Sequence, residues 1–309
     1  VNWTTCYRTP ERILNHWADH HGLDGLTVAS LAPHFDAVEE RLSIKDWPVN
    51  IANENNRKLY EGAKALGYDV KGMRRNIKGC ANTGFCGLGC PVEAKQAMGV
   101  TFIPDAIAQG LTIYSDVEAQ RLVVQGGRVT AVEANVLDRQ SGKPSGKRLE
   151  IKAKVTVSSC GAINGPALLI RSGLGDLGPV GKRTFLHPVV SVAAYYEDEV
   201  EGYYGAPQSV GSHHFIDRGP ERFGFFLEVP PLQPMLASSG MALFGDRQLE
   251  FMSKLPFMGS IIALSVDGLV PGDQAGTVSV RSDGRISLDY PISDALVESF
   301  TEAHHVMCK

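Results

Sequence analysis

The chain has 309 residues, of which 43% are hydrophobic and 21% charged. This balance is typical of a globular protein of about two domains and excludes an intrinsically disordered one. A formal net charge of -4 leaves no basic excess for binding nucleic acid or an anionic membrane. The longest uncharged stretch, residues 229–245, is interrupted by prolines and is too short for a transmembrane segment. We therefore expect a soluble protein, with cytoplasm and periplasm left open.

The first third of the chain has the apolar spacing of helices. Pro10 suits a first helical position after Thr9, and residues 32–42 and 55–66 repeat apolar side chains at intervals of three and four. Gly67 is placed to end the second of these helices. A further helix is expected over residues 93–108, after an ordered loop rich in glycine and cysteine.

From residue 111 the apolar period changes to two, which predicts strands. The expected strands cover residues 111–115, 121–124, 129–137, 149–158, 189–196 and 259–266, with a hairpin over 277–288. The fourth strand should end in a buried segment, residues 155–157, followed by Gly161 and a helix over 166–172. A strand, a glycine turn and a helix in that order predict an α/β crossover of a nucleotide-binding sheet.

Two motifs have the spacing of known cofactor-binding or metal-binding sequences. Residues 173–178 spell G-x-G-x-x-G, but they follow a helix and precede Pro179, so we interpret them as a helix end and not as a dinucleotide fingerprint. Cys80, Cys86 and Cys90 have the spacing C-x5-C-x3-C. Their thiolates suit an iron–sulfur cluster, or zinc with a fourth ligand. The alternative is a loop whose thiols pack as small apolar groups.

Candidate acid–base groups are few. Glu228 lies in the apolar run 225–231. Facing a cavity, it would have a raised pKa and could exchange protons, whereas facing solvent it would be the polar half of an alternating strand. The alternation slightly favours the solvent-facing interpretation. The nine histidines are expected to be structural, and no G-x-S-x-G or Walker phosphate loop supports a hydrolase or a kinase.

Residues 161–175, GAINGPALLIRSGLG, resemble the second signature of the glucose–methanol–choline (GMC) family of FAD-dependent oxidoreductases, departing from it at Gly165. Residues 1–5 resemble the end of the first signature, residues 181–188 the entry to the substrate domain, and residues 79–98 a cysteine loop of bacterial members. The resemblance implies an α/β (mixed α+β) fold. A partial FAD-binding domain with an antiparallel meander would cover residues 1–186, including the cysteine loop 79–91. A partial substrate-binding sheet domain would cover residues 187–309.

The resemblance also implies site residues. Asn2 and Thr5 would lie near the flavin ring, and the backbone of Ala119 would meet the adenine. On the adenosine side the cofactor would be bordered by Ser159, Cys160 and Gly161. The FAD pyrophosphate loop and the segment with the catalytic histidine have no counterpart in the chain, so we expect a piece of a larger protein.

The leading hypothesis is an FAD-dependent enzyme that oxidises a small-molecule alcohol by hydride transfer to flavin. The apolar segments 223–227 and 255–264 hint at an apolar alcohol. A second hypothesis adds an iron–sulfur cluster at the three cysteines, which would pass electrons to an acceptor protein, such as a cytochrome, or to a quinone. A third makes the chain a non-catalytic module with a loop stapled by zinc. Oxidase and dehydrogenase are not separated by the sequence.

Overall fold

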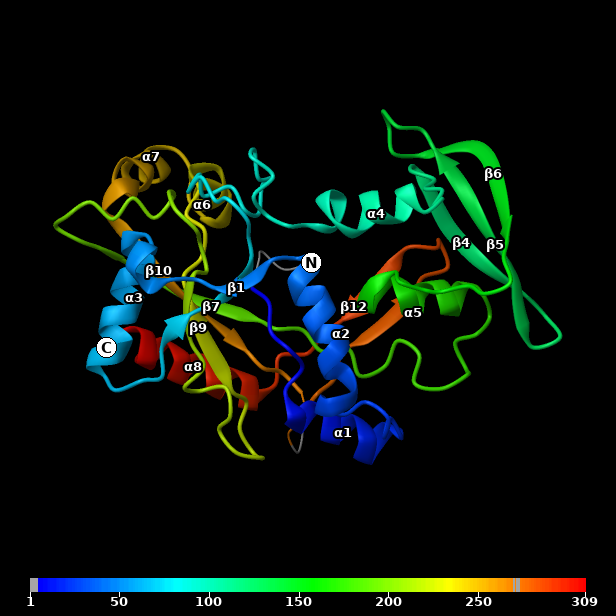
Figure 1. The fold of residues 1–309 in the computed structure, drawn as a ribbon, viewed down its shortest axis with the longest axis horizontal. Helices are drawn as coiled ribbons and strands as arrows, with labels where there is room; N and C mark the ends of the chain where they lie inside the picture. Colours follow the sequence, from blue (N-terminus) through cyan, green and yellow to red (C-terminus); the bar gives the residue numbers. More distant parts are fainter. Residues whose placement is uncertain (1–4, 269, 271–272) are drawn as a thin grey trace.

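A computed structural model describes residues 5–268, 270 and 273–309 (Figure 1). Asn2 lies outside the described residues. The helices are α1 (Glu11–His21), α2 (Val28–Arg41), α3 (Glu54–Ala65), α4 (Phe102–Ala108), α5 (Gly161–Arg171), α6 (Pro234–Gly240), α7 (Asp246–Ser253) and α8 (Asp294–Met307), with short 3-10 turns at Val49–Ile51, Met98–Val100 and Leu255–Phe257. The strands are β1 (Ile44–Asp46), β2 (Lys71–Gly72), β3 (Arg74–Asn76), β4 (Val117–Gln125), β5 (Arg128–Leu137), β6 (Pro144–Lys152), β7 (Val189–Tyr195), β8 (Val210–Ser212), β9 (Phe225–Glu228), β10 (Met258–Ser265), β11 (Thr277–Val280) and β12 (Ile286–Asp289). This is the mixed α/β architecture with antiparallel sheets that the sequence predicts.

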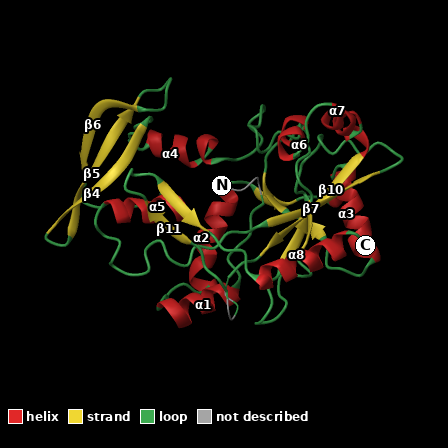
Figure 2. Ribbon diagram, turned by 180° about the vertical axis from the view of Figure 1, so that it is seen from behind, coloured by secondary structure: helices red, strands yellow, loops and turns green. Residues whose placement is uncertain are grey.

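The main core lies against a five-stranded sheet of order β2-β8-β9-β10-β7, whose strands pair antiparallel. Helices α3 and α8 cover one face of this sheet, because Leu59 and Val306 pack with Phe225 and Leu227 of β9. Figure 2 shows the two helices beside the sheet from behind. The sheet therefore joins strand β2, from the first part of the chain, to strands from the second.

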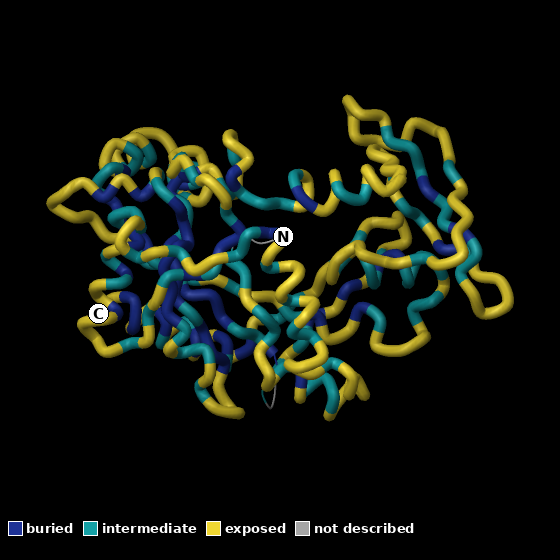
Figure 3. The backbone as a smooth tube through the Cα atoms, viewed as in Figure 1, coloured by how far each residue is buried: buried dark blue, intermediate teal, exposed yellow. Residues whose placement is uncertain are grey.

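The other side of the molecule is built on the antiparallel meander β4-β5-β6. The turn Gly126-Gly127 has positive φ at both residues, as the sequence predicts for this hairpin. Helix α5 packs against β4 and β11. Figure 3 shows that buried segments gather around the five-stranded sheet, whereas this side is mostly exposed.

Helix boundaries follow local capping. Helix α2 begins at Val28, four residues before the predicted start, because Thr27 and Ser30 form a reciprocal capping box. Pro10 is the N-cap of α1 and not its first helical residue. Helix α3 ends as predicted, with Gly67 at φ +74°. The helix expected over 93–108 is reduced to a 3-10 turn and α4.

One predicted strand is wrong, and another is correct only in its first part. Residues 111–115 have no regular structure, and β6 ends at Lys152, so residues 155–157 form neither a strand nor an α/β crossover. Val155 and Val157 are 77% and 78% exposed. Their apolar pattern is that of a buried strand, but none of the described residues pairs with them. Nor does any described helix have the length and apolar character to cross a membrane.

Candidate active site

Glu228 is buried on the face of β9 opposite the helices. Along β9, Phe225 and Leu227 point to the core under α3 and α8, so Glu228 points the other way. The expected alternation is therefore present, but the solvent-facing interpretation of Glu228 is wrong, because its side chain is only 2% exposed. The N-terminal segment and strand β3 cover this face of the sheet.

Two neutral side chains bind the carboxylate. Gln208 Nε2 donates a hydrogen bond to Glu228 Oε2 at 2.6 Å, and Thr5 Oγ1 donates to Oε1 at 3.5 Å. Gln208 has φ +49°, a backbone conformation that non-glycine residues rarely adopt, and its N–H donates to the carbonyl of Val229. Such a conformation persists where surrounding contacts impose it, often at functional sites. The Glu228 carboxylate is thus fixed by an amide that is itself held in place.

The surroundings place the titration of Glu228 in the neutral range. Burial raises its pKa to about 7, against the hydrogen bond from Gln208, the charge of Arg75 and the hydrogen bond from Thr5. Tyr7 packs nearby, and burial raises its pKa to about 12 despite a backbone hydrogen bond. Tyr7 therefore stays protonated where Glu228 titrates, which makes Glu228 the group suited to proton exchange at neutral pH.

Two buried polar atoms on the residues that act on this carboxylate, Arg75 Nε and Gln208 Oε1, have no hydrogen-bond partner among the described residues. Buried polar groups in native proteins nearly always have partners, so these two atoms indicate a place where water or a ligand completes the bonding. Arg75 and Gln208 carry no local sequence signal, and the sequence analysis missed both.

The cysteine loop lies beside this site without forming a metal centre. Cys86 Sγ is 3.6 Å from Arg75 Nη2, and Cys80 Sγ contacts Asn82. Across residues 5–268, 270 and 273–309, no three His, Cys, Asp or Glu side chains are grouped so that they could hold a metal. Cys80, Cys86 and Cys90 therefore do not fit an iron–sulfur cluster or a zinc site in this structure.

The residues expected at the adenosine end lie together at the start of α5. Ser159, Cys160 and Gly161 are exposed, and α5 has no side-chain cap. Gly161 has φ +77°, and nothing lies within 4 Å of where its Cβ would be. A cavity of about 470 Å³ opens beside them, bordered by Ser158, Ala162 and Lys182 among others. These features leave room for a ligand next to a free helix N-terminus.

Ala119 lies on β4, on the same side of the molecule. Its pairing with Ala134 is followed by a register shift between Ala119 and Arg121. A bulge disrupts the ladder and re-aims the backbone there. Figure 1 shows α5 and β4 on one side of the molecule and the five-stranded sheet on the other.

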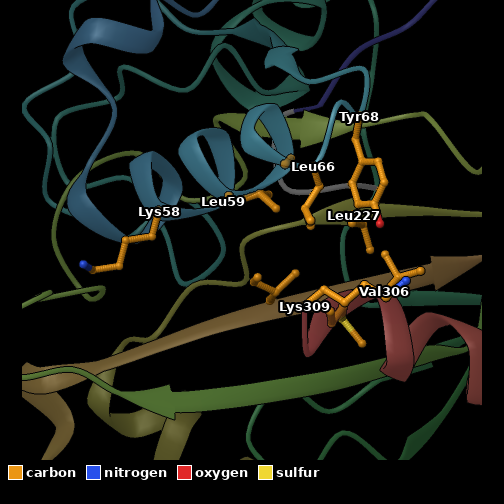
Figure 4. Close-up of a pocket in the computed structure, with 11 residues that line it drawn as sticks. Lys58, Leu59, Leu66, Tyr68, Leu227, Val306 and Lys309 are labelled. Carbon is orange, nitrogen blue, oxygen red and sulfur yellow. The ribbon is translucent and has the colours of Figure 1, made fainter.

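A second cavity has a different character. An apolar crevice of about 60 Å³ lies between α3, β9 and α8, lined by Leu59, Leu66, Leu227 and Val306 among others (Figure 4). Leu227 faces it, so it lies on the opposite face of β9 from Glu228. It contains no carboxylate, histidine or cysteine. It is a gap in the core packing and not part of the acid–base site.

Comparisons with known proteins show which family this chain resembles. The family model described as GMC oxidoreductase matches residues 1–189. The chain belongs to the GMC oxidoreductase family. It is 30% identical over 290 residues to an uncharacterised GMC-type oxidoreductase of Mycobacterium tuberculosis (strain ATCC 25618 / H37Rv), covering 94% of this chain and 44% of the relative. The resemblance found in the sequence is thereby confirmed.

Other similar proteins share a lower sequence identity with this chain. The long-chain-alcohol oxidase FAO3 of Arabidopsis thaliana is 29% identical over 205 residues, which is 64% of this chain and 27% of that protein. The crystal structure of pyridoxine 4-oxidase from Mesorbium loti matches 99% of this chain and 63% of its own, with a TM-score of 0.65 and 16% identity. This likeness shows a shared fold. The chain spans less than half the length of both sequence relatives.

Proposed function

We propose that the protein containing this chain is an FAD-dependent oxidoreductase that oxidises the CH–OH group of a small-molecule alcohol to an aldehyde or ketone. The observation that carries this proposal is the hydrogen bond between Thr5 and Glu228. Thr5 is the residue that the family resemblance places beside the flavin ring, and Glu228 is a buried carboxylate that titrates near neutrality. The bond brings an acid–base group to the place expected for the redox chemistry.

The described residues are compatible with FAD. Ser159, Cys160 and Gly161 at the start of α5 would border its adenosine part, and the bulged backbone at Ala119 would meet the adenine. Asn2, outside the described residues, and Thr5 would lie near the ring. When bound, FAD supplies the hydride acceptor of the reaction.

The chain's own contribution to the chemistry is proton handling. Glu228 would exchange a proton with the substrate hydroxyl, directly or through water, while Gln208 fixes one carboxylate oxygen and offers its free Oε1 to a polar ligand. The histidine that the resemblance assigns to hydroxyl deprotonation has no counterpart here. Glu228 is thus proposed as the acid–base group that this part of the enzyme provides.

The substrate is proposed to be an apolar alcohol, on different grounds from the sequence hint. Phe223, Phe225, Leu227 and Leu255 are buried, so packing of the core is enough to explain their apolar character. Support comes instead from relatives named long-chain-alcohol oxidases. We also propose the division into a FAD-binding part, residues 1–186, and a substrate part, residues 187–309.

The route of the electrons beyond flavin stays open between oxygen and an acceptor protein or quinone. The iron–sulfur alternative and the zinc-stapled module receive no support, because the described residues include no group of three His, Cys, Asp or Glu side chains that could hold a metal.

The test uses the longest polypeptide that the gene encodes, purified without denaturants. We expect a flavin absorbance band that is bleached anaerobically by primary alcohols, with an apparent affinity that rises with alkyl chain length. A protein that neither carries nor takes up added FAD would refute the proposal. A flavin that no alcohol reduces would refute the reaction and leave the cofactor assignment standing.

A further inference from the structure

Arg75 is a buried arginine in the middle of β3. It is 1% exposed, and its guanidinium lies 5.5 Å from the centroid of the Trp47 ring. Its Nη1 donates hydrogen bonds to the carbonyls of Pro207 and Gln208, the latter at 2.6 Å. Nη2 donates to Cys86 Sγ at 3.6 Å. One side chain thus connects β3, the cysteine loop and the segment before β8.

No carboxylate forms a salt bridge with Arg75 among the described residues. A buried cation without an ion pair is costly, so its retention calls for a compensating role. The carboxylate that attracts it is Glu228, whose own titration is influenced by Arg75. Between them stands Gln208, whose carbonyl binds Arg75 and whose side-chain amide binds Glu228.

We propose that Arg75 is the positioning residue of the Glu228 site, which it acts on by holding the Pro207–Gln208 backbone so that the Gln208 amide is presented to the carboxylate. The inference rests on the proposed function for its catalytic consequence, but not for its structural content. Two adjacent carbonyls turned toward one guanidinium nitrogen explain how Gln208 keeps its left-handed backbone conformation.

Charge adds to this geometry. The ionisable groups that interact with the carboxylate are Arg75 and Tyr7, while Cys80 and Cys86 interact with the guanidinium of Arg75. Tyr7 stays neutral where Glu228 titrates, so Arg75 supplies the cationic charge that favours an ionised carboxylate. Removal of that charge should move the titration of Glu228 to higher pH.

The experiment compares Arg75→Met, Arg75→Lys and the matched control Arg74→Met. Arg74 is the neighbour on the same strand, but its side chain points to Glu39 and Asp46. The first readout needs no activity. It is the pH midpoint of the Glu228 carboxyl stretch, assigned by infrared difference against Glu228→Gln. The second is the pH profile of kcat/KM for alcohol oxidation.

Arg75→Met is expected to move the carboxyl midpoint and the acidic limb of the profile upward together. Arg75→Lys keeps the charge, but its single ammonium nitrogen replaces a guanidinium whose Nη1 binds both carbonyls while Nη2 binds Cys86 Sγ. We therefore expect a small shift in midpoint and a loss of about tenfold in kcat. Arg74→Met should leave both readouts at their wild-type values. In a Glu228→Gln background, Arg75→Met should not move the acidic limb further.

Folded Arg75 variants with a wild-type carboxyl midpoint and wild-type kcat would overturn the inference. Where neither variant folds, Cys86→Ala decides, because it removes one hydrogen bond from the guanidinium and keeps the charge. Cys86→Ala should shift the carboxyl midpoint of Glu228 upward, as Arg75→Met does, but by a smaller amount. An unchanged midpoint would overturn the inference. A midpoint that responds in a protein that oxidises no alcohol would uphold the positioning role while refuting the proposed function.

Discussion

Replacement of Glu228 by glutamine should change how the stability of the protein depends on pH. The pKa of Glu228 is raised from 4.5 to about 7 by burial. At 1.36 kcal/mol per pKa unit, ionising this carboxyl in the folded state costs about 3 kcal/mol more than in the unfolded chain. Well below pH 4.5 the carboxyl is protonated in both states, and the wild type keeps its full stability. Between pH 4.5 and about 7 the unfolded chain has released this proton and the folded protein still holds it. The wild type therefore loses stability progressively as the pH rises to and through the folded pKa, whereas E228Q does not.

The assay is urea unfolding of both proteins at several values between pH 4 and pH 8. The free energy of unfolding of E228Q, minus that of the wild type, should increase by about 3 kcal/mol across this range. Glu39→Gln is the control, because hydrogen bonds from Arg8 and Arg74 lower the pKa of Glu39 to about 2. Glu39 is ionised in both states above about pH 5.5. The free energy of unfolding of E39Q, minus that of the wild type, should therefore stay constant between about pH 5.5 and pH 8. If the difference between E228Q and the wild type did not change with pH, the conclusion that burial raises the pKa of Glu228 would be refuted.

Three further outcomes are expected. Iodoacetamide at pH 7.5 should label Cys90 faster than Cys86: burial opposes ionisation of both, but backbone N–H groups outweigh it at Cys90 and lower its pKa, whereas the pKa of Cys86 is raised. Gly84→Ala should destabilise the protein by about 1–3 kcal/mol more than Gly89→Ala in urea unfolding. Both glycines have positive φ, but only at Gly84 would a Cβ meet a carbonyl oxygen, at 2.1 Å. Asn56→Ala should cost about 2–4 kcal/mol, because Asn56 Oδ1 accepts from two buried backbone N–H groups at 3.0 Å.

Each of these three has an outcome that contradicts it. Equal labelling of the two thiols would show that the backbone groups do not stabilise the Cys90 thiolate. Equal stabilities of the two alanine variants would mean that the cysteine loop is not packed against its neighbour at Gly84. A loss below about 0.5 kcal/mol for Asn56→Ala, similar to that expected at the exposed Asn50, would mean that water replaces the amide.

The parts of the fold that follow from local chemistry were predictable. The Gly126-Gly127 turn fixes the hairpin of β4 and β5, and Gly67 ends α3, because these positions need the positive φ that glycine allows. The start of α2 was within reach as well, since Thr27 and Ser30 are three residues apart. The prediction of a strand at residues 155–157 was wrong for a non-local reason. A strand needs a neighbour to pair with, and an apolar pattern alone does not show whether one is present.

The candidate site was likewise predictable only in part from the sequence. Glu228 was singled out because a carboxylate in an apolar run is unusual, but its direction was misjudged, since alternation tells which residues share a face and not what covers that face. The cover comes from Thr5, Arg75 and Gln208. The contacts of Thr5 and Arg75 on this face join residues more than a hundred positions apart in the chain. No local motif encodes such contacts.

The composition of this covered face is itself an argument for function. The opposite face of β9 is closed by apolar side chains from α3 and α8, which is the inexpensive way to cover a sheet. On the Glu228 face the chain instead buries a carboxylate, a guanidinium with no ion pair among the described residues, and an amide on a residue with left-handed backbone. Each of these is destabilising compared with an apolar replacement. A chain that keeps all three together, next to the segment expected at the flavin, sacrifices stability where the proposed proton transfer needs a preorganised group.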